Sequence, residues 1–171
     1  MAGTARKITV VGDPVLATPC QPVTEFDAGL AALIDDMFAS MYAADGVGLA
    51  APQIGLAERC VVVDVSRSPR AGENHGLLRL VNPAILEASQ WKIGREGCLS
   101  FPDLLANVKR AQKIRVSALN EKGEKLNFVS LGFEAVAIQH EIDHLDGILF
   151  LDRVRSSKDL FERKKEAGLP I

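Results

Sequence analysis

The sequence predicts an α+β fold with a mostly antiparallel sheet and one buried, central helix. Three observations favour this class. Apolar residues recur at helical spacing in two segments, short β-branched runs lie between turn residues, and a polar four-residue turn joins two of those runs. No internal repeat or linker divides the chain, so residues 1–171 are expected to form a single domain.

Composition and charge bound the kind of protein. The chain has 171 residues, of which 47% are hydrophobic and 25% charged, and its formal net charge is −2. This balance fits a globular domain and lacks the broad basic field that nonspecific DNA binding needs. The apolar run near the start is too short for a signal peptide, and no run approaches the roughly 18 apolar residues of a membrane span. We therefore predict a cytoplasmic protein with neither DNA nor membrane as a partner.

The first predicted helix covers residues 26–44, where Asp27 is placed to cap the N-terminus and apolar residues recur every three or four positions. It ends near Asp45. The Gly-rich segment from Gly46 to Gly55 shows neither helical nor alternating periodicity, and a loop is predicted there.

Apolar and β-branched runs predict the strands. Three of these runs are bounded by turn residues and cover residues 60–65, 77–81 and 114–119. A fourth, residues 125–129, follows the polar turn at residues 120–123, which predicts a hairpin and hence a mostly antiparallel sheet.

Two further helices are predicted near the C-terminus. Residues 133–145 have the pattern of a largely buried helix, with Gly147 as its stop. A polar helix is predicted over residues 158–167, within a C-terminal helical tail of about residues 156–171.

The buried helix contains the sequence His140-Glu141-Ile142-Asp143-His144, which fits the pattern H-E-x-x-H. Residues four apart on a helix lie on one face, so the imidazoles of His140 and His144 can reach a single metal ion. Glu141 lies beside the first histidine without being a ligand, which suits a general base. The spacing favours a metal centre over the alternative of two ordinary histidines on a helix.

A catalytic metal centre needs a third protein ligand and an open position. Cys98 is the best candidate, because a thiolate is a strong ligand for divalent iron or zinc and its neighbours predict an exposed loop or strand end. The remaining histidine, His75, lies in a polar segment and is expected to be solvated. Cys20 and Cys60 are expected to be small structural side chains.

Three segments stand in order along the chain: GVGLAAPQ at residues 46–53, EGCLS at residues 96–100 and HEIDHLDG at residues 140–147. Together they closely resemble the three signature motifs of bacterial peptide deformylases, and the resemblance extends from Asp13 to about Arg153. It implies antiparallel β-sheets packed around a central helix that carries the HEIDH motif. It also implies one catalytic domain that removes the formyl group from the N-terminal formylmethionine of nascent polypeptides and releases formate.

The resemblance also implies roles for individual residues. The implied metal ligands are Cys98, His140 and His144. Glu141 is implied as the acid and base, and the Gln53 amide and the Leu99 backbone N–H as donors to the formyl oxygen. The implied cofactor is one divalent ion, Fe²⁺ in the cell, which Zn²⁺, Ni²⁺ or Co²⁺ can replace in a purified sample.

Selection of methionine is expected to come from an apolar pocket. Gly46 and Gly48 suit a loop that a substrate backbone approaches closely, because a Cβ would obstruct it. Val47, Val136 and Ala137 are the candidate lining residues, with ordinary core packing as the alternative.

Other polar residues leave alternatives open. Glu96 and Asp143 either orient the ligands or Arg110, or form ordinary ion pairs. Several relatives carry a basic residue seven positions after the ligand cysteine, where this chain has Leu105, so the grip on the peptide beyond methionine is open. Residues 152–171 hold six basic and four acidic side chains. Because the C-terminal helix of some relatives contacts the ribosome, this basic tail is either a ribosome contact or a solvated helix.

Two other function classes fit part of the pattern. The motif H-E-x-x-H alone would also suit a zinc endopeptidase, and a metal could instead stabilise a noncatalytic domain. The cysteine ligand argues against the endopeptidase. Closed structural sites usually have four protein ligands, whereas only three are evident here, beside an intact Glu141.

Overall fold

The computed structural model of the protein describes residues 3–163. Its two α-helices are α1 (Ala28–Ala43) and α2 (Gly132–Leu145). Its strands are β1 (Gly48–Ala50), β2 (Cys60–Val63), β3 (Leu78–Cys98), β4 (Phe101–Leu119), β5 (Lys125–Leu131) and β6 (Leu160–Glu162). Short 3₁₀ turns occur at Pro14–Ala17, Ala51–Ile54, Phe150–Arg153 and Ser157–Asp159.

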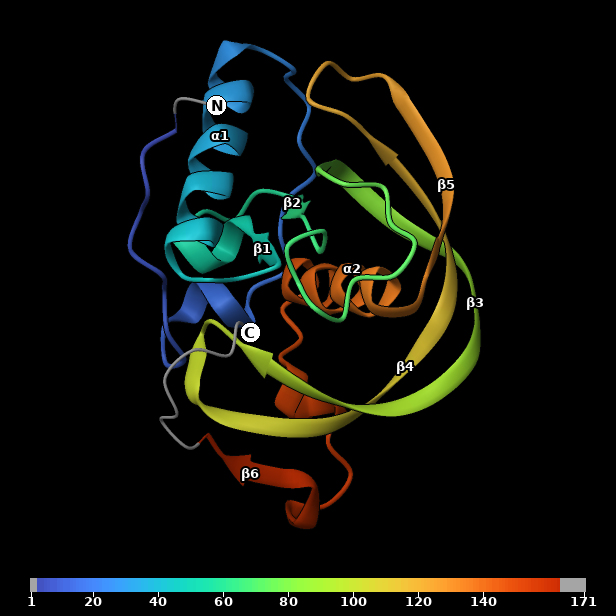
Figure 1. Ribbon diagram of the computed structural model, residues 1–171. Coiled ribbons are helices and arrows are strands. Elements are labelled where there is room, and N and C mark those ends of the chain that lie inside the picture. The colour runs from blue at the N-terminus through green and yellow to red at the C-terminus, as the bar shows by residue number, and fades with distance from the viewer. Residues whose placement is uncertain (1–2, 164–171) are drawn as a thin grey trace.

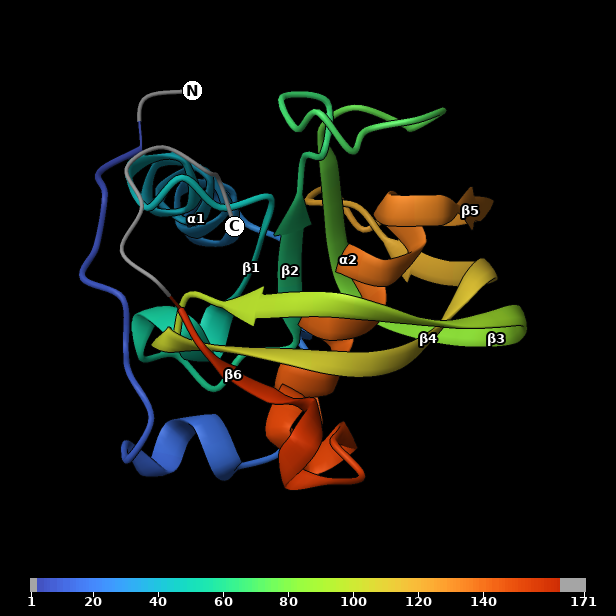
Figure 2. The ribbon, with the colours of Figure 1, turned by 60° about the horizontal axis from the view of Figure 1, so that its bottom comes forward.

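The strands form one antiparallel sheet that curves around α2. Its order is β1-β2-β3-β4-β5, and β6 pairs with the first half of β4. The long β3–β4 hairpin bends across α2, so the helix lies at the centre of the molecule with β1 and β2 on one side and the hairpin on the other (Figures 1 and 2). The predicted α+β class, with antiparallel strands around a central helix, is confirmed.

Strand β2 separates two apolar cores, because successive side chains of a strand point to opposite faces. Val61 and Val63 face α2, whereas Cys60 and Val62 face α1. The first core also contains residues of α2 and of β4: Ala135, Ile138, Ile142, Leu145, Ile114 and Val116. A strand buried on both faces has no polar alternation, which is why residues 60–63 form a continuous apolar run.

Both predicted helix boundaries are confirmed. The Leu30 backbone N–H donates to Asp27 Oδ1 at 3.0 Å, so Asp27 caps α1 as expected. Helix α2 ends at Leu145, and Gly147 has a φ of +70°, the left-handed conformation that stops a helix. No helix within residues 3–163 combines the length and apolar character needed to cross a membrane.

The predicted loop at residues 46–55 was wrong in part. This segment contains β1 and the 3₁₀ turn Ala51–Ile54, and Leu49 is fully buried between the sheet and α1. A three-residue strand is too short to show a period. Its pairing with β2 is a tertiary contact that the local sequence does not encode.

The predicted helix at residues 158–167 was also wrong within the described part of the chain. Residues 157–159 form a 3₁₀ turn, and β6 then pairs with residues 104–106 of β4. That edge of the hairpin offers free backbone groups, and pairing with them outweighs the weak helical pattern. The rest of the expected helical tail, residues 164–171, lies outside the described residues.

Replacing Gly147 by alanine should destabilise the protein. A Cβ there would lie 2.9 Å from the backbone carbonyl atoms of Ala17, in addition to the cost of about 1–2 kcal/mol of a left-handed backbone for other residues. Urea unfolding should show a loss of at least about 2 kcal/mol for Gly147→Ala.

Two other glycines separate the causes. Gly12 has a positive φ, but nothing lies within 4 Å of a Cβ added there. Gly12→Ala should therefore lose only the stability that a left-handed backbone costs other residues, about 1–2 kcal/mol. Gly72 has neither feature, and Gly72→Ala should leave the unfolding midpoint unchanged. Equal midpoints for all three variants would contradict this account.

Candidate active site

Three predicted ligands converge at one buried point. Cys98 Sγ and a ring nitrogen from each of His140 and His144 all lie within 4.8 Å of one another. The histidines come from successive turns of α2, with ring centroids 5.1 Å apart, and Cys98 is the last residue of β3. Cys98 Sγ lies 3.2 Å from His144 Nε2. One thiol and two imidazoles form a donor set that suits a divalent transition metal ion and leaves a coordination position open.

The charges around this cluster favour a bound cation. Burial alone would lower the pKa of His140, but the negative charges of Cys98, Glu96 and Glu141 raise that pKa well above its usual range. Burial and the positive charge of His140 lower the pKa of His144 well below its usual range. A site that holds a proton on one imidazole through surrounding anions attracts a metal ion to the same place. The donor set and its surroundings therefore fit the metal that the motif implies.

Glu141 is a buried carboxyl between the two histidines. Burial raises its pKa to about 7, against an ordinary value of 4.5. Its Oε2 has no hydrogen-bond partner among residues 3–163. A carboxyl group with a pKa near neutrality and an unpartnered oxygen can both accept and return a proton at physiological pH.

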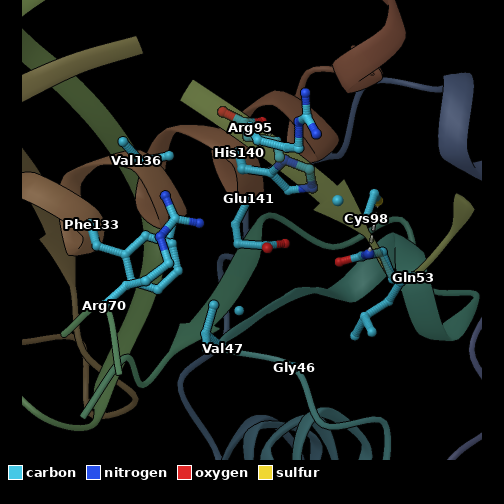
Figure 3. A pocket seen from close by; sticks show the side chains of 15 residues that line it. Gly46, Val47, Gln53, Arg70, Arg95, Cys98, Phe133, Val136, His140 and Glu141 are labelled. Carbon is cyan, nitrogen blue, oxygen red and sulfur yellow. Dashed lines mark hydrogen bonds and ion pairs between the residues drawn. The ribbon is translucent and has the colours of Figure 1, made fainter. Parts of the chain in front are cut away.

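Gln53 lies beside Cys98, at the other end of the pocket from Phe133, as Figure 3 shows. It lies in the 3₁₀ turn after β1, where the Ala50 backbone N–H donates to its Oε1 at 2.9 Å. Its Nε2 therefore points inward and donates to Ser100 Oγ at 3.3 Å and toward Cys98 Sγ at 3.7 Å. Leu99 follows Cys98 and lines the same pocket. The fold thus brings both predicted oxyanion donors to the side of the cysteine.

A pocket lies next to the cluster (Figure 3). All five residues predicted to contact the substrate line it: Gly46, Val47, Gly48, Val136 and Ala137. Sequence reasoning missed Phe133, Arg70 and Arg95, which also line the pocket. Phe133 could have been found, because it lies one helical turn before Ala137. The two arginines belong to a loop and to an exposed stretch of strand, and no pattern singles them out.

A buried ion-pair network lies behind the ligands. The Glu96 carboxylate contacts His140 Nδ1 at 3.0 Å and accepts hydrogen bonds from the Arg110 guanidinium at 2.8 and 3.1 Å. Arg110 also donates to Asp143 at 2.6 Å, and Arg153 donates to the same carboxylate at 2.6 and 3.1 Å. Burial alone would raise the pKa of Glu96, but hydrogen bonds from His140 and Arg110 lower it to about 2. Glu96 therefore stays ionised and fixes the orientation of the His140 ring.

The other two cysteines lie in the apolar cores. Burial raises the pKa of Cys20 to about 11 and that of Cys60 to about 12, so both remain neutral thiols. His75 is not merely solvated, as its polar neighbours predicted. Its Nδ1 lies 2.7 Å from Oε1 of the buried Glu134, and its backbone N–H donates to Oε2 at 2.6 Å. These partners are 59 positions apart in the sequence, so local reasoning could not pair them.

Comparisons with known proteins agree with this geometry. Residues 5–160 match the sequence model of the family described as polypeptide deformylase. A peptide deformylase of Heliobacterium modesticaldum is 51% identical over 152 residues, which span 88% of this chain and 94% of the relative. The crystal structure of peptide deformylase from Thermotoga maritima superimposes with a TM-score of 0.82 at 40% identity, covering 89% of this chain and 99% of that one.

A third comparison concerns a structure of class I type b peptide deformylase from Acinetobacter baumannii, bound to Met-Ala-Ser. It superimposes with a TM-score of 0.83 at 37% identity and covers 88% of this chain and 99% of that one. The resemblance drawn from the three sequence motifs is therefore confirmed, and the chain belongs to the polypeptide deformylase family.

Proposed function

We propose that this chain is a metal-dependent hydrolase that removes the formyl group from formylmethionyl nascent peptides and releases formate. One observation carries the proposal: a buried cluster of one thiol and two imidazoles lies beside Glu141 at an apolar pocket. The Met-Ala-Ser bound to the Acinetobacter relative is a peptide that begins with methionine, which fits the product of this reaction. The proposal treats residues 1–171 as one catalytic domain.

The metal ligands in this proposal are Cys98, His140 and His144. When bound, a divalent ion supplies Lewis acidity, which lowers the pKa of water to about 7 and polarises a carbonyl oxygen. We assign Fe²⁺ as the physiological ion, and Zn²⁺, Ni²⁺ and Co²⁺ accept the same thiolate and imidazole donors.

Glu141 moves the proton in both halves of the reaction. Its unpartnered Oε2 accepts a proton from the attacking water, whose oxygen forms a bond to the formyl carbon. The bond between that carbon and the methionine nitrogen then breaks, and Glu141 returns the proton to the leaving amine. Formate and a peptide with a free N-terminus result.

Two donors stabilise the charge on the formyl oxygen. In this proposal they are Gln53 Nε2, held in place by the contact of its amide oxygen with Ala50, and the Leu99 backbone N–H. Loss of one such donor typically costs about 3 kcal/mol of transition-state stabilisation. The methionine side chain occupies the apolar part of the pocket, between Val47 on one side and Val136 and Ala137 of α2 on the other.

Gly48 acts through Glu141 as well as through the substrate. The sequence predicts that a substrate backbone approaches this glycine closely. In the structure, a Cβ at Gly48 would lie 2.6 Å from Glu141 Oε1 and 2.8 Å from its Cγ. A side chain at this position would therefore displace the proposed base.

The proposed substrate also indicates the compartment in which the enzyme works. Formylated chains emerge from the ribosome, so the enzyme is proposed to work in the cytoplasm. Contact with the ribosome through the basic tail stays a prediction. Of the basic side chains in that tail, Arg153 pairs with Asp143, and Lys164 and Lys165 lie outside the described residues.

The first test is formate release from formyl-Met-Ala-Ser by anaerobic protein loaded with Fe²⁺ or Ni²⁺. The Glu141→Gln variant should lose at least about 100-fold in kcat, because its amide cannot accept the proton. Its metal content, measured by atomic emission, should equal that of the wild type. No formate from the wild type, or full formate release by Glu141→Gln, would overturn the proposal or the role of Glu141, respectively.

The cysteines give a second prediction. Cys98→Ala should lose both bound metal and formate release, because only two imidazole ligands remain. Cys60→Ala is the matched control: it removes a buried sulfur from the apolar core, costs about 1 kcal/mol of stability, and should keep metal and activity. Retention of one equivalent of tightly bound metal by Cys98→Ala would exclude Cys98 as a ligand.

A third prediction concerns Gly48. Gly48→Ala should lower kcat by about tenfold to 100-fold with a smaller change in KM, because the Cβ moves the base rather than the substrate. Gly94 on β3 has nothing within 4 Å of a Cβ, so Gly94→Ala serves as the control for an added methyl group. A wild-type kcat for Gly48→Ala would show that Glu141 tolerates the displacement.

A further inference from the structure

Two arginines at the mouth of the pocket have no role in the chemistry described above. Arg70, from the loop between β2 and β3, and Arg95, from β3, both line the pocket (Figure 3). Both are exposed, whereas the other lining residues are buried or half-buried. Among residues 3–163, neither guanidinium forms an ion pair with a carboxylate. Glu96 also lines the pocket, but its carboxylate already pairs with Arg110 and His140.

Aromatic rings hold both guanidinium groups in place. The guanidinium carbon of Arg70 lies 4.1 Å from the ring centroid of Phe133, and that of Arg95 lies 3.8 Å from the ring centroid of Phe161. A guanidinium that stacks on a ring keeps its N–H groups at the edge available for a carboxylate. Both guanidinium groups are therefore ordered before a substrate binds.

Hydrogen bonds connect the loop that contains Arg70 to α2. The His75 backbone and ring both contact the buried Glu134 carboxylate, which also accepts a hydrogen bond from Ser130 Oγ at 2.7 Å. Glu134 directly follows Phe133 in the first turn of α2, so one short segment of the helix anchors the loop and supports Arg70. The position of this cation is set by the fold.

Arg95 and its aromatic partner lie on either side of Leu105 in the sheet. In the sheet register, Leu105 lies opposite Gly97 on one side and Phe161 on the other. Arg95 lies two residues before Gly97, and the Arg95 guanidinium stacks on the Phe161 ring. Strand β3 thus supplies a cation to the pocket beside Leu105.

We propose that Arg70 and Arg95 are specificity-determining residues that favour formylmethionyl peptides with an acidic side chain at the first or second position after methionine. This inference rests on the proposed function. With the formyl group at Glu141 and the methionine side chain in the apolar part, the remaining peptide leaves the pocket through the mouth that these two cations flank. An acidic side chain there meets oriented donors, whereas a lysine meets like charge.

The experiment compares kcat/KM for C-terminally amidated peptides that differ at one residue. The set is formyl-Met-Glu-Ser, formyl-Met-Gln-Ser and formyl-Met-Lys-Ser, and the matching set with the variable residue in third place. The wild type should prefer Glu over Gln by about threefold to tenfold in at least one set, as expected for exposed ion pairs, and the difference should appear in KM. High salt should reduce this preference.

The variant Arg70→Met/Arg95→Met keeps the apolar stems and removes both charges, so its ratio of Glu to Gln should fall to about one. Arg67→Met is the matched control. Arg67 belongs to the same loop and stacks on Tyr42 at 4.9 Å, but it does not line the pocket, so this variant should keep the wild-type ratio.

The outcomes separate the two proposals. Formate released equally from the Glu, Gln and Lys peptides by the wild type would overturn the specificity inference and leave the deformylase function intact. A preference that survives in the double variant, or that persists at high salt, would also overturn it. Absence of formate from every peptide would overturn the proposed function itself.

Discussion

The burial of polar side chains on α2 is the constraint on which the rest of the structure depends. A helix at the centre of a small protein would normally be apolar on all sides, because each buried polar group must find a partner or lose its hydration without compensation. Six of the fourteen residues of α2 are nonetheless both polar and buried. They are Glu134, Gln139, His140, Glu141, Asp143 and His144. Most of these polar atoms therefore need a counterpart from the surrounding structure, and the exceptions among the described residues are Glu141 Oε2 and His144 Nδ1, which have no hydrogen-bond partner.

The β3–β4 hairpin supplies most of those counterparts, which explains its length and curvature. Gln139 pairs with both backbone groups of Ala111 on β4, so its amide takes the place of a neighbouring strand. Arg110, next to Ala111, turns inward to bridge Asp143 and the Glu96 carboxylate of β3. The last residue of β3 is the cysteine of the candidate metal site. The hairpin must therefore be long enough to pass the helix and curved enough to bring both strands against it.

The candidate metal ligands and the candidate base could be predicted from the sequence, whereas only part of the fold could. The spacing of His140 and His144 and the caps at Asp27 and Gly147 are local, so they could be predicted from residue types and helical geometry. Residues 86–95 of β3 are all exposed, and the buried positions of β4 opposite them include the charged Arg110. The apolar alternation is therefore weak, and only the outer ends of the two strands were predicted. The partner of His75 and the strand formed by residues 160–162 depend on contacts between distant segments. Such contacts leave no periodic trace in either segment.

The two carboxyl groups that line the pocket show how environment, rather than residue type, assigns a role. Glu96 and Glu141 have the same side chain and are both buried. Two cationic partners hold the pKa of Glu96 near 2, which makes it a permanent anion suited to orienting an imidazole. Glu141 has no such hydrogen bonds on its Oε2, so burial dominates and raises its pKa to about 7. Environments that push two pKa values apart divide acid–base work from support, and here that division supports the proposed role of Glu141 as the base with an argument that does not depend on the sequence motif.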